Sequence, residues 1–199
     1  MINKCLNCIL SCSDVNRDRI FPKVDLKPAR IRLIMISEAP PIDRTQYFYE
    51  SPSGSFFRTT QMAFADAGIP ILSYVDLTRM GVYLTTAIKC SKKGYAVCSS
   101  TIKGCSLLLE AEITQFPNIK VVMCMGDVAI KAINSIGKRS NGVNVIPTGS
   151  TYRIRDRTYE QGGIRYFPSY TQTGDSFDIE KVKRRMVSED IKQAMAIGM

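Results

Sequence analysis

Five short segments of the chain are rich in apolar, β-branched or aromatic residues and have the length of a strand. Residues 32–37 and 119–126 are almost continuously apolar, a pattern typical of strands buried on both faces. Residues 81–89 are β-branched and aromatic, which favours a strand as well. The first segment must end at the Pro40-Pro41 pair, because proline interrupts both ladders and helices. Two later segments, TYRIRD and GIRYFP, are also predicted to be strands.

Between these segments, apolar residues recur at helical spacing. Gly68 and Gly137 stand where C-terminal glycines would end two of the helices. Asp178 is predicted to be the N-cap of the last helix, whose apolar face would include Ile179 and Val182. The four predicted helices cover residues 55–68, 99–116, 126–137 and 178–195.

This alternation of strands and helices predicts an α/β fold with a mainly parallel central sheet and helices on both faces. We find no internal repeat or long linker, so the expectation is one domain over residues 1–199, with residues 1–27 as a cysteine-rich leader. In such sheets ligands bind beyond the carboxyl ends of the strands. The loops to inspect for function follow Ser37, Ile88, Met125 and Phe167.

The overall composition places few limits on function, but the net charge and the lack of histidine narrow the range of candidate functions. The chain has 45% apolar and 23% charged residues and a net charge of +9, which suits a polyanionic partner such as nucleic acid. General solubility explains such a charge equally well. There is no histidine, so acid–base catalysis and metal ligation by imidazole are excluded for this chain.

The amino terminus has no long apolar segment before a cleavage site, so the expected compartment is the cytoplasm. In that reducing environment cysteines serve as ligands or free thiols rather than disulfides. Cys5 and Cys8 form a C-x-x-C pair, and Cys90 and Cys105 lie far along the chain. A close pair with two distant single cysteines can supply four thiolates to zinc or to an iron–sulfur cluster, although such a pair can also be redox-active or accidental. The cysteines less suited to such a site are Cys12, Cys98 and Cys124, the last within an apolar strand.

Seven motifs in chain order, CLNC, SEAPP, FYESPSG, YLTTAIKC, KGC, VVMCMGDVAI and FPSY, together resemble the iron–sulfur uracil-DNA glycosylases. The resemblance runs from Cys5 to Tyr170. It implies a three-layer α/β/α sandwich, action on single- or double-stranded DNA, and removal of uracil or another damaged base in base-excision repair. We also expect a monomer with no membrane partner. The resemblance also implies a [4Fe–4S] cluster that ties the leader to the rest of the fold. The implied cluster ligands are Cys5, Cys8, Cys90 and Cys105.

The resemblance also assigns roles around a pocket for a base rotated out of the stack. Glu38 matches a carboxylate that would hold water or stabilise a sugar cation, and the alternative is that it caps a helix. Tyr49 is in register with an aromatic residue that stacks on the base, and the adjacent Phe48 is the alternative for this role. Either ring could instead pack in the core. The neighbouring pocket residues are Ser37, Ala39 and Pro40.

Contacts with the DNA backbone are expected on two segments. Ser53 and Gly54 match small residues that allow close approach to DNA. Lys89, Lys92 and Lys93 follow the second predicted strand, where a phosphate could lie, although lysines in loops are more often simply solvated.

Three departures from the family pattern fall on the base pocket. Thr86 stands where the family has an asparagine, and a hydroxyl cannot offer a donor and an acceptor side by side as an amide does. Phe167 replaces a histidine donor, whose role would pass to Ser169, Tyr170 or a backbone N–H. Pro41 replaces a glycine.

These departures leave three hypotheses open: a glycosylase with altered base preference, a non-catalytic or differently tasked relative that keeps the cluster and binds nucleic acid, and an unrelated zinc-stabilised binding module.

Overall fold

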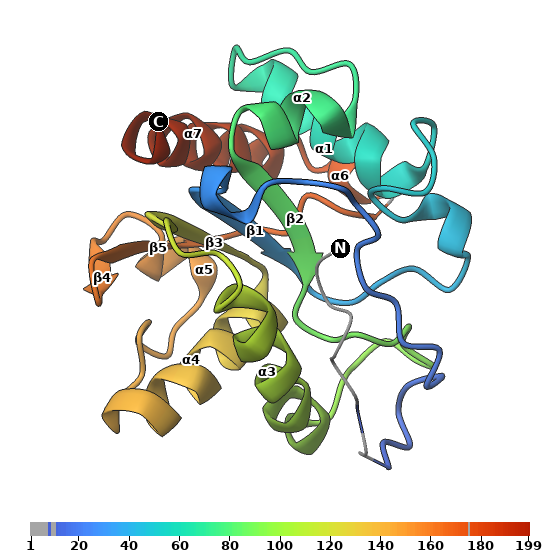
Figure 1. Ribbon diagram of the computed structural model, residues 1–199, viewed down its shortest axis with the longest axis vertical. Coiled ribbons are helices and arrows are strands. Elements are labelled where there is room, and N and C mark those ends of the chain that lie inside the picture. Colours follow the sequence, from blue (N-terminus) through green and yellow to red (C-terminus); the bar gives the residue numbers. More distant parts are fainter. Residues whose placement is uncertain (1–7, 9–10, 175) are drawn as a thin grey trace.

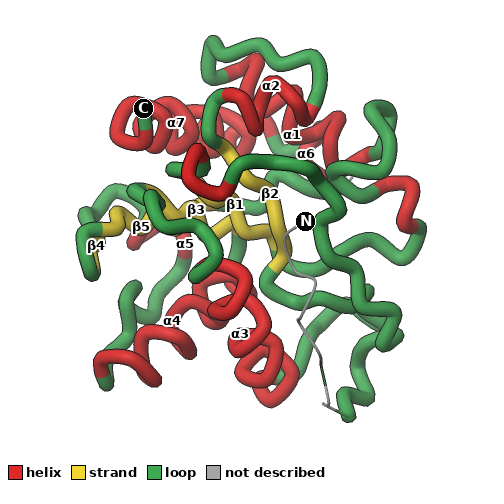
Figure 2. The backbone as a smooth tube through the Cα atoms, viewed as in Figure 1, coloured by secondary structure: helices red, strands yellow, loops and turns green. Residues whose placement is uncertain are grey.

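The computed structural model describes residue 8, residues 11–174 and residues 176–199. Within this part of the chain, one central sheet lies between two layers of helices (Figures 1 and 2), which confirms the predicted three-layer α/β/α architecture. The strand order is β2-β1-β3-β5-β4. The strands are β1 (Leu33–Ser37), β2 (Val82–Thr86), β3 (Val121–Met125), β4 (Tyr159–Gln161) and β5 (Ile164–Ser169).

The sheet is parallel except at one edge. β1 pairs in parallel with both β2 and β3, β3 pairs in parallel with β5, and β4 pairs antiparallel with β5. Ser37 is opposite Thr86, and Met125 is opposite Ser169. The carboxyl ends of β1, β2, β3 and β5 therefore meet at one edge, as the sequence predicted.

The two helical layers differ in how they cover the sheet. On one face α1 (Ser55–Asp66) packs against α7 (Lys181–Gly198), with α2 (Tyr74–Arg79) beside β2, and on the other face α3 (Ser99–Ile113) packs against α4 (Asp127–Asn141) (Figure 1). Short 3-10 helices, η1 (Pro28–Arg30) and η2 (Arg44–Gln46), and the one-turn helix α5 (Thr151–Ile154) lie in the connections. The remaining helix, α6 (Ser176–Ile179), comes directly before α7 in the chain.

The core lies on both faces of the sheet, which explains the uninterrupted apolar runs of β1 and β3. Every residue of β1, β2 and β3 is buried. Burying one Leu, Ile or Met side chain stabilises the fold by roughly 1.5–3 kcal/mol. Among the described helices, none is long and apolar enough to cross a membrane.

The end of α4 corrects one prediction. The helix continues past Gly137 to Asn141 and ends at Gly142, whose φ of 76° is the left-handed conformation that a terminal glycine supplies. Gly137 is required for close packing instead. A Cβ at this position would lie 2.6 Å from Val145 Cγ2 and 3.0 Å from the Val143 carbonyl oxygen. By contrast, Gly68 follows the end of α1 with a φ of 78°, as predicted.

The segment predicted to be the last helix forms two helices, and the prediction of Asp178 as its N-cap is wrong. α6 and α7 are separated at Glu180, and Asp178 lies inside α6, where its carboxylate pairs with Arg58 at 3.0 Å. Ile179 and Val182 are 79% and 60% exposed, so the predicted apolar face does not begin there. The buried face of α7 begins at Val187, where the helix reaches the sheet.

The predicted strand TYRIRD is also wrong, because its residues form α5 and the turn after it. Arg153 N and Ile154 N both donate to the Ser150 carbonyl, which starts a helical turn, and Ile154 is buried. Alternation of apolar and polar residues over so few positions does not distinguish a strand from one helical turn. The sequence analysis also missed α2, although its Ser73-x-x-Asp76 capping box is a recognisable start signal.

We predict that Gly137→Ala destabilises the fold by about 1–2 kcal/mol, because overpacking against Val143 and Val145 outweighs the higher helix propensity of alanine. Chemical denaturation measures the difference in free energy of unfolding. Gly94→Ala is the control, since a Cβ there meets nothing within 4 Å, and it should change stability by less than about 0.5 kcal/mol. Equal stability of the two variants would contradict the close-packing role of Gly137.

Candidate functional site

A cavity of about 300 Å³ opens at the carboxyl edge of the sheet. Its walls come from the loop after β1, the loop after β2, the start of α1 and the loop after β5, so it occupies the place where parallel sheets bind ligands. Its size is at the lower end of the range of small-molecule sites. The lining residues are Glu38, Ala39, Pro40, Pro41, Ile42, Phe56, Lys92, Gly94, Thr171, Thr173 and Gly174.

Glu38 and Lys92 form the charged part of this cavity. Glu38 Oε2 lies 3.1 Å from Lys92 Nζ, and the two side chains are 33% and 26% exposed. The backbone fixes Glu38, because Ala87 N donates to the Ser37 carbonyl and Ile88 N donates to the Glu38 carbonyl. A pair this exposed contributes about 0–1 kcal/mol to stability, so it is not a main determinant of the fold.

Several predicted pocket residues lie in the core and not in this cavity. Tyr49 is only 9% exposed, its hydroxyl donates to the Leu84 carbonyl at 3.0 Å and accepts from Leu84 N at 2.7 Å, and its ring stacks on Tyr83. Phe48, Thr86 and Phe167 are buried too. In this arrangement no ring of the 47–49 segment lines the cavity, and the aromatic side chain that does so is Phe56.

Sequence reasoning missed Phe56, Thr171 and Thr173. Phe56 falls within the predicted helix 55–68, and nothing in the sequence signals that its side chain lines a cavity. Thr171 and Thr173 follow directly after the FPSY motif at the carboxyl edge of the sheet, so their position was available as a signal.

The two late-motif residues predicted as replacement donors have structural partners. Ser169 is fully buried, and its Oγ donates to Asp190 Oδ2 at 2.5 Å. Asp190 also accepts from Arg155 Nη2 at 2.8 Å, and burial raises the pKa of its carboxyl group. Tyr170 is half-buried against the core, and the Lys183 ammonium lies 5.6 Å from its ring centroid. Neither side chain lines the cavity.

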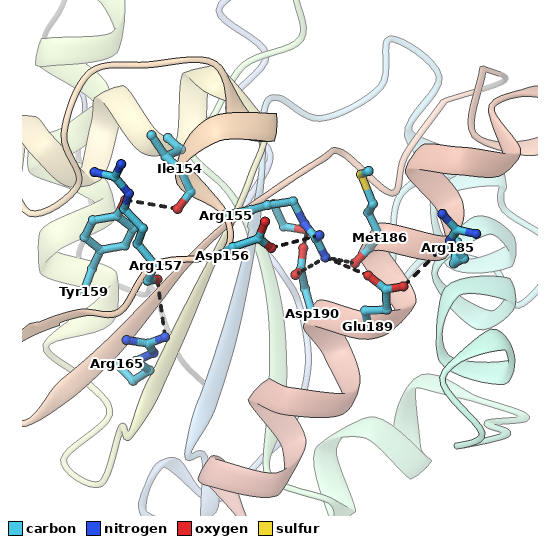
Figure 3. A network of polar contacts seen from close by, with 11 residues as sticks. Ile154, Arg155, Asp156, Arg157, Tyr159, Arg165, Arg185, Met186, Glu189 and Asp190 are labelled. Atoms are coloured by element: carbon cyan, nitrogen blue, oxygen red, sulfur yellow. Dashed lines mark hydrogen bonds and ion pairs between the residues drawn. The ribbon is translucent and has the colours of Figure 1, made fainter.

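Arg155 joins α5 to α7 through the same carboxylate. Besides Asp190 it contacts Asp156, Glu189 and the Met186 carbonyl (Figure 3). Because buried charges are stable only with partners, this network fixes Asp190, and through it Ser169, at the end of β5.

Of the predicted DNA contacts, only some are accessible. Ser53 is exposed, and Lys93 is exposed with its ammonium donating to the Ser13 carbonyl at 3.0 Å. Gly54 is buried, and a Cβ there would lie 2.8 Å from the Thr45 carbonyl oxygen, so packing inside the protein accounts for the glycine. Lys89 is fully buried, which does not agree with a direct phosphate contact.

Lys89 instead belongs to a buried polar network. Its ammonium pairs with Glu112, which is also fully buried, and donates to Thr85 Oγ1 at 2.9 Å. Glu112 accepts in addition from Tyr83 OH at 2.7 Å and from Thr85 Oγ1 at 3.0 Å. This ion pair connects the end of β2 with α3.

A second cavity, of about 250 Å³, lies beside Lys89 and is lined by cysteines. Burial raises the pKa of the Cys105 thiol to about 11 and also raises that of Cys90. Arg17 and Arg19 line the same cavity and supply positive charge, while Lys89 lines it with its ammonium already paired with Glu112. The thiols at its wall are Cys8, Cys12, Cys90 and Cys105.

Cys12 is the unexpected member of this set, and Cys5 lies outside the described residues. Cys98 is exposed, and Cys124 is fully buried inside β3, so neither lines the cavity. Among the described residues, no group of three Cys, Asp or Glu side chains is arranged so that it could hold a metal ion.

Backbone pairing between the leader and the loop after β2 builds this cavity. Asn16 N donates to the Ser91 carbonyl, and Lys93 N donates to the Asp14 carbonyl. The Asp14 carboxylate accepts from Cys98 N and Thr101 Oγ1 at the start of α3, and these hydrogen bonds lower its pKa against the opposing effect of burial. The leader is thereby attached to the same loop that carries Lys92.

The model of the Uracil DNA glycosylase superfamily matches residues 24–176. The chain belongs to this superfamily. The matched range contains β1 to β5 and every loop that lines the carboxyl-edge cavity. Superfamily membership agrees with the resemblance stated from the sequence motifs.

The chain is also similar in sequence to the type-5 uracil-DNA glycosylase of Thermus thermophilus. It is 22% identical over 123 residues, which are 62% of this chain and 53% of the relative. The chain therefore matches about half the length of that protein.

We predict that Lys89→Met destabilises the fold by about 3–5 kcal/mol, because it leaves Glu112 charged and buried without its cation. Thermal or chemical denaturation measures the loss. The matched control is Lys92→Met, which removes a part-exposed pair and should cost less than about 1 kcal/mol. A loss for Lys89→Met as small as that of the control would mean that Glu112 is not held as an ion.

Proposed function

We propose that the chain is a DNA glycosylase that hydrolyses the N-glycosidic bond of uracil or another deaminated or damaged base in base-excision repair. The observation that carries the proposal is the position of Glu38 and Lys92 in a cavity at the carboxyl edge of the sheet, within the range that matches the superfamily. The relative's activity supports the same reaction class.

The chemistry requires stabilisation of a cationic sugar, a positioned water and a pocket for a base rotated out of the stack. Glu38 supplies the carboxylate, which attracts the developing positive charge and accepts a hydrogen bond from the attacking water. Phe56 and the flat edges of Pro40 and Pro41 supply apolar surface for the base and sugar.

Lys92 is also suited to binding a DNA phosphate at the rim of the carboxyl-edge cavity. Its ammonium is part-exposed and donates to the Tyr95 carbonyl at 3.1 Å while pairing with Glu38. A DNA phosphate at the rim offers Lys92 another partner, and the net charge of +9 favours DNA through counterion release. Exposed Lys93 lies next to it.

We also propose a [4Fe–4S] cluster in the cysteine-lined cavity, with Cys8, Cys90 and Cys105 among its ligands. The donor chemistry fits, because these thiols face one cavity whose other walls carry cationic side chains. A cluster spreads four thiolates over four iron atoms, so its ligands lie further apart than those of a single zinc ion. Such a cluster would supply structural cross-linking, holding the leader against the loop after β2.

The fourth ligand has two candidates. The resemblance assigns Cys5, which precedes the described part of the chain, whereas Cys12 lines the cavity itself. Iron content distinguishes them.

The second candidate function is a non-catalytic relative that binds nucleic acid. The buried positions of Thr86, Phe167 and Ser169 favour it, because none of these side chains reaches the cavity as a donor. An excision assay separates the two functions.

We predict that the protein excises at least one base from oligonucleotides carrying uracil, hypoxanthine, xanthine or 5-hydroxymethyluracil, and that Glu38→Gln slows single-turnover excision on the order of 100-fold or more. Affinity for DNA should rise by no more than about threefold, since the substitution removes one partly exposed charge that repels phosphate and is screened by salt.

Glu160→Gln, on exposed β4, is the matched control and should keep the parental rate. An unchanged rate in Glu38→Gln would reject its catalytic role. Absence of excision of every base by a folded protein that still binds DNA would favour the second candidate.

We predict that anaerobically purified protein contains about four irons per chain, and that Cys90→Ser or Cys105→Ser loses them and lowers the melting temperature. Iron analysis and the visible absorbance of the cluster measure the loss. Cys98→Ser, an exposed thiol away from the cavity, is the control.

Comparison of Cys5→Ser with Cys12→Ser then identifies the fourth ligand, because only the ligand variant should lose iron. Stoichiometric zinc in place of iron would contradict the cluster and favour a zinc-stabilised module.

A further inference from the structure

Tyr95, in the loop after β2, has the most exposed large apolar side chain among the described residues, at 98%. A ring this exposed buries almost no apolar surface, so core packing does not explain a tyrosine at this position. Single exposed apolar side chains are common on protein surfaces and need no explanation by themselves. Tyr95 is distinguished by its place, because the loop that carries it lines the carboxyl-edge cavity.

Lys92 connects the ring of Tyr95 to the rim of that cavity. Lys92 and Gly94 both line the cavity, and Tyr95 follows Gly94 directly. The Lys92 ammonium donates to the Tyr95 carbonyl at 3.1 Å and lies 5.8 Å from the centroid of the tyrosine ring. The same ammonium is 3.1 Å from Glu38 Oε2. The ring therefore lies beside the charged part of the cavity.

The leader holds the backbone of this loop in place, although the Tyr95 ring itself is not packed. Val15 and Lys92 form an antiparallel bridge, and Lys93 N donates to the Asp14 carbonyl at 3.0 Å. Binding to a loop that is already ordered loses less conformational entropy than binding to a loop that must first be ordered. The loop thus presents the ring as a preorganised surface.

A second apolar side chain stands at the same rim on another loop. Ile42, in the loop after β1, is 73% exposed and lines the cavity. Lys92 and the exposed Lys93 add positive charge beside these apolar groups. An occupant that covers both kinds of group needs a flat apolar face next to a negative charge. A nucleotide has this combination in its base and its phosphate.

We propose that Tyr95 stacks on an unpaired base beside the target nucleotide, and that the chain binds single-stranded DNA in preference to duplex. Stacking requires a base whose face is free, and in an intact duplex each face is covered by the neighbouring base pair. An aromatic ring beside cationic side chains is the combination by which proteins hold single strands without reading their sequence. Ile42 supplies apolar contact from the loop after β1.

This inference rests on the proposed function for its polymer, and it names the form of the strand that the cavity receives. It assigns a role to a residue outside the sequence motifs. Tyr95 contacts a neighbouring base and not the bond that breaks, so it is a positioning residue. It holds the strand so that the target nucleotide reaches the cavity of Glu38.

The test measures binding separately from excision. The full-length protein is titrated with a single-stranded oligonucleotide that carries a tetrahydrofuran abasic analogue, which cannot be excised, with 2-aminopurine as the next base. The same strand in a duplex is the comparison, and the anisotropy of an end label gives both affinities. The parental protein should bind the single strand about fivefold more tightly or better, and stacking should quench the 2-aminopurine fluorescence.

Tyr95→Ala should weaken binding to the single strand about tenfold and remove the quenching, as expected for one lost stacking contact. The dependence of affinity on salt concentration should not change, because stacking releases no counterions. Tyr95→Phe should keep the affinity and the quenching, since the ring and not the hydroxyl makes the contact. Tyr152→Ala is the matched control, because Tyr152 is 65% exposed on α5 and does not line the cavity, and it should bind like the parent.

Tyr95→Trp gives an independent readout, because the chain has no tryptophan of its own. Its emission should be quenched when the single strand binds, whereas the emission of Tyr152→Trp should not change. Both tyrosines are exposed, so these variants should fold like the parent, which circular dichroism verifies.

The outcomes separate this inference from the proposed function. A parental preference for duplex, or Tyr95→Ala with the parental affinity for the single strand, overturns the role of Tyr95 whether or not a base is excised. Self-association that depends on Tyr95, with DNA binding unaffected by Tyr95→Ala, assigns the ring to a contact between copies and also overturns it. Single-strand binding that depends on Tyr95 in a protein that excises nothing upholds the inference and rejects the glycosylase.

Discussion

Parallel pairing of β1 with both of its neighbours is the constraint on which the rest of the structure depends. It brings Ser37, Thr86 and Met125 to one edge, and the pairing of β3 with β5 adds Ser169. Connections between parallel strands must cross over the sheet, so the helices cover its faces and the loops after the strands gather at the carboxyl edge. Residues more than a hundred positions apart, such as Glu38 and Thr171, thereby line one cavity.

Two buried charge networks fix the ends of the outer parallel strands. Lys89 and Glu112 hold the end of β2 to α3, while Arg155 and Asp190 hold the end of β5 to α7. Buried ion pairs contribute little net stability compared with apolar packing, but breaking one is costly. Their effect here is to specify one arrangement of the loops that follow.

The loop after β2 links the two cavities. Cys90 lies at the cysteine-lined cavity, and Lys92, two residues on, lies at the carboxyl-edge cavity. The leader pairs with the same loop through Asn16 and Ser91. The leader and the two cavities are therefore connected through a few residues of backbone in this loop.

The sequence by itself determined the fold class and the order of the main strands and helices. These follow from local period and composition: continuous apolar runs are buried strands, and a strand-to-loop boundary at Glu38 or Cys90 is visible in the residues themselves. It did not determine whether TYRIRD is a strand or a helical turn, or whether Gly137 ends a helix or allows close packing, because both outcomes satisfy the same local pattern. Only tertiary structure decided which side chains of the motifs face a cavity. Tyr49, Thr86, Lys89 and Ser169 are buried within the core, while Phe56, Cys12, Thr171 and Thr173 line the cavities, since exposure depends on neighbours that are distant in the chain.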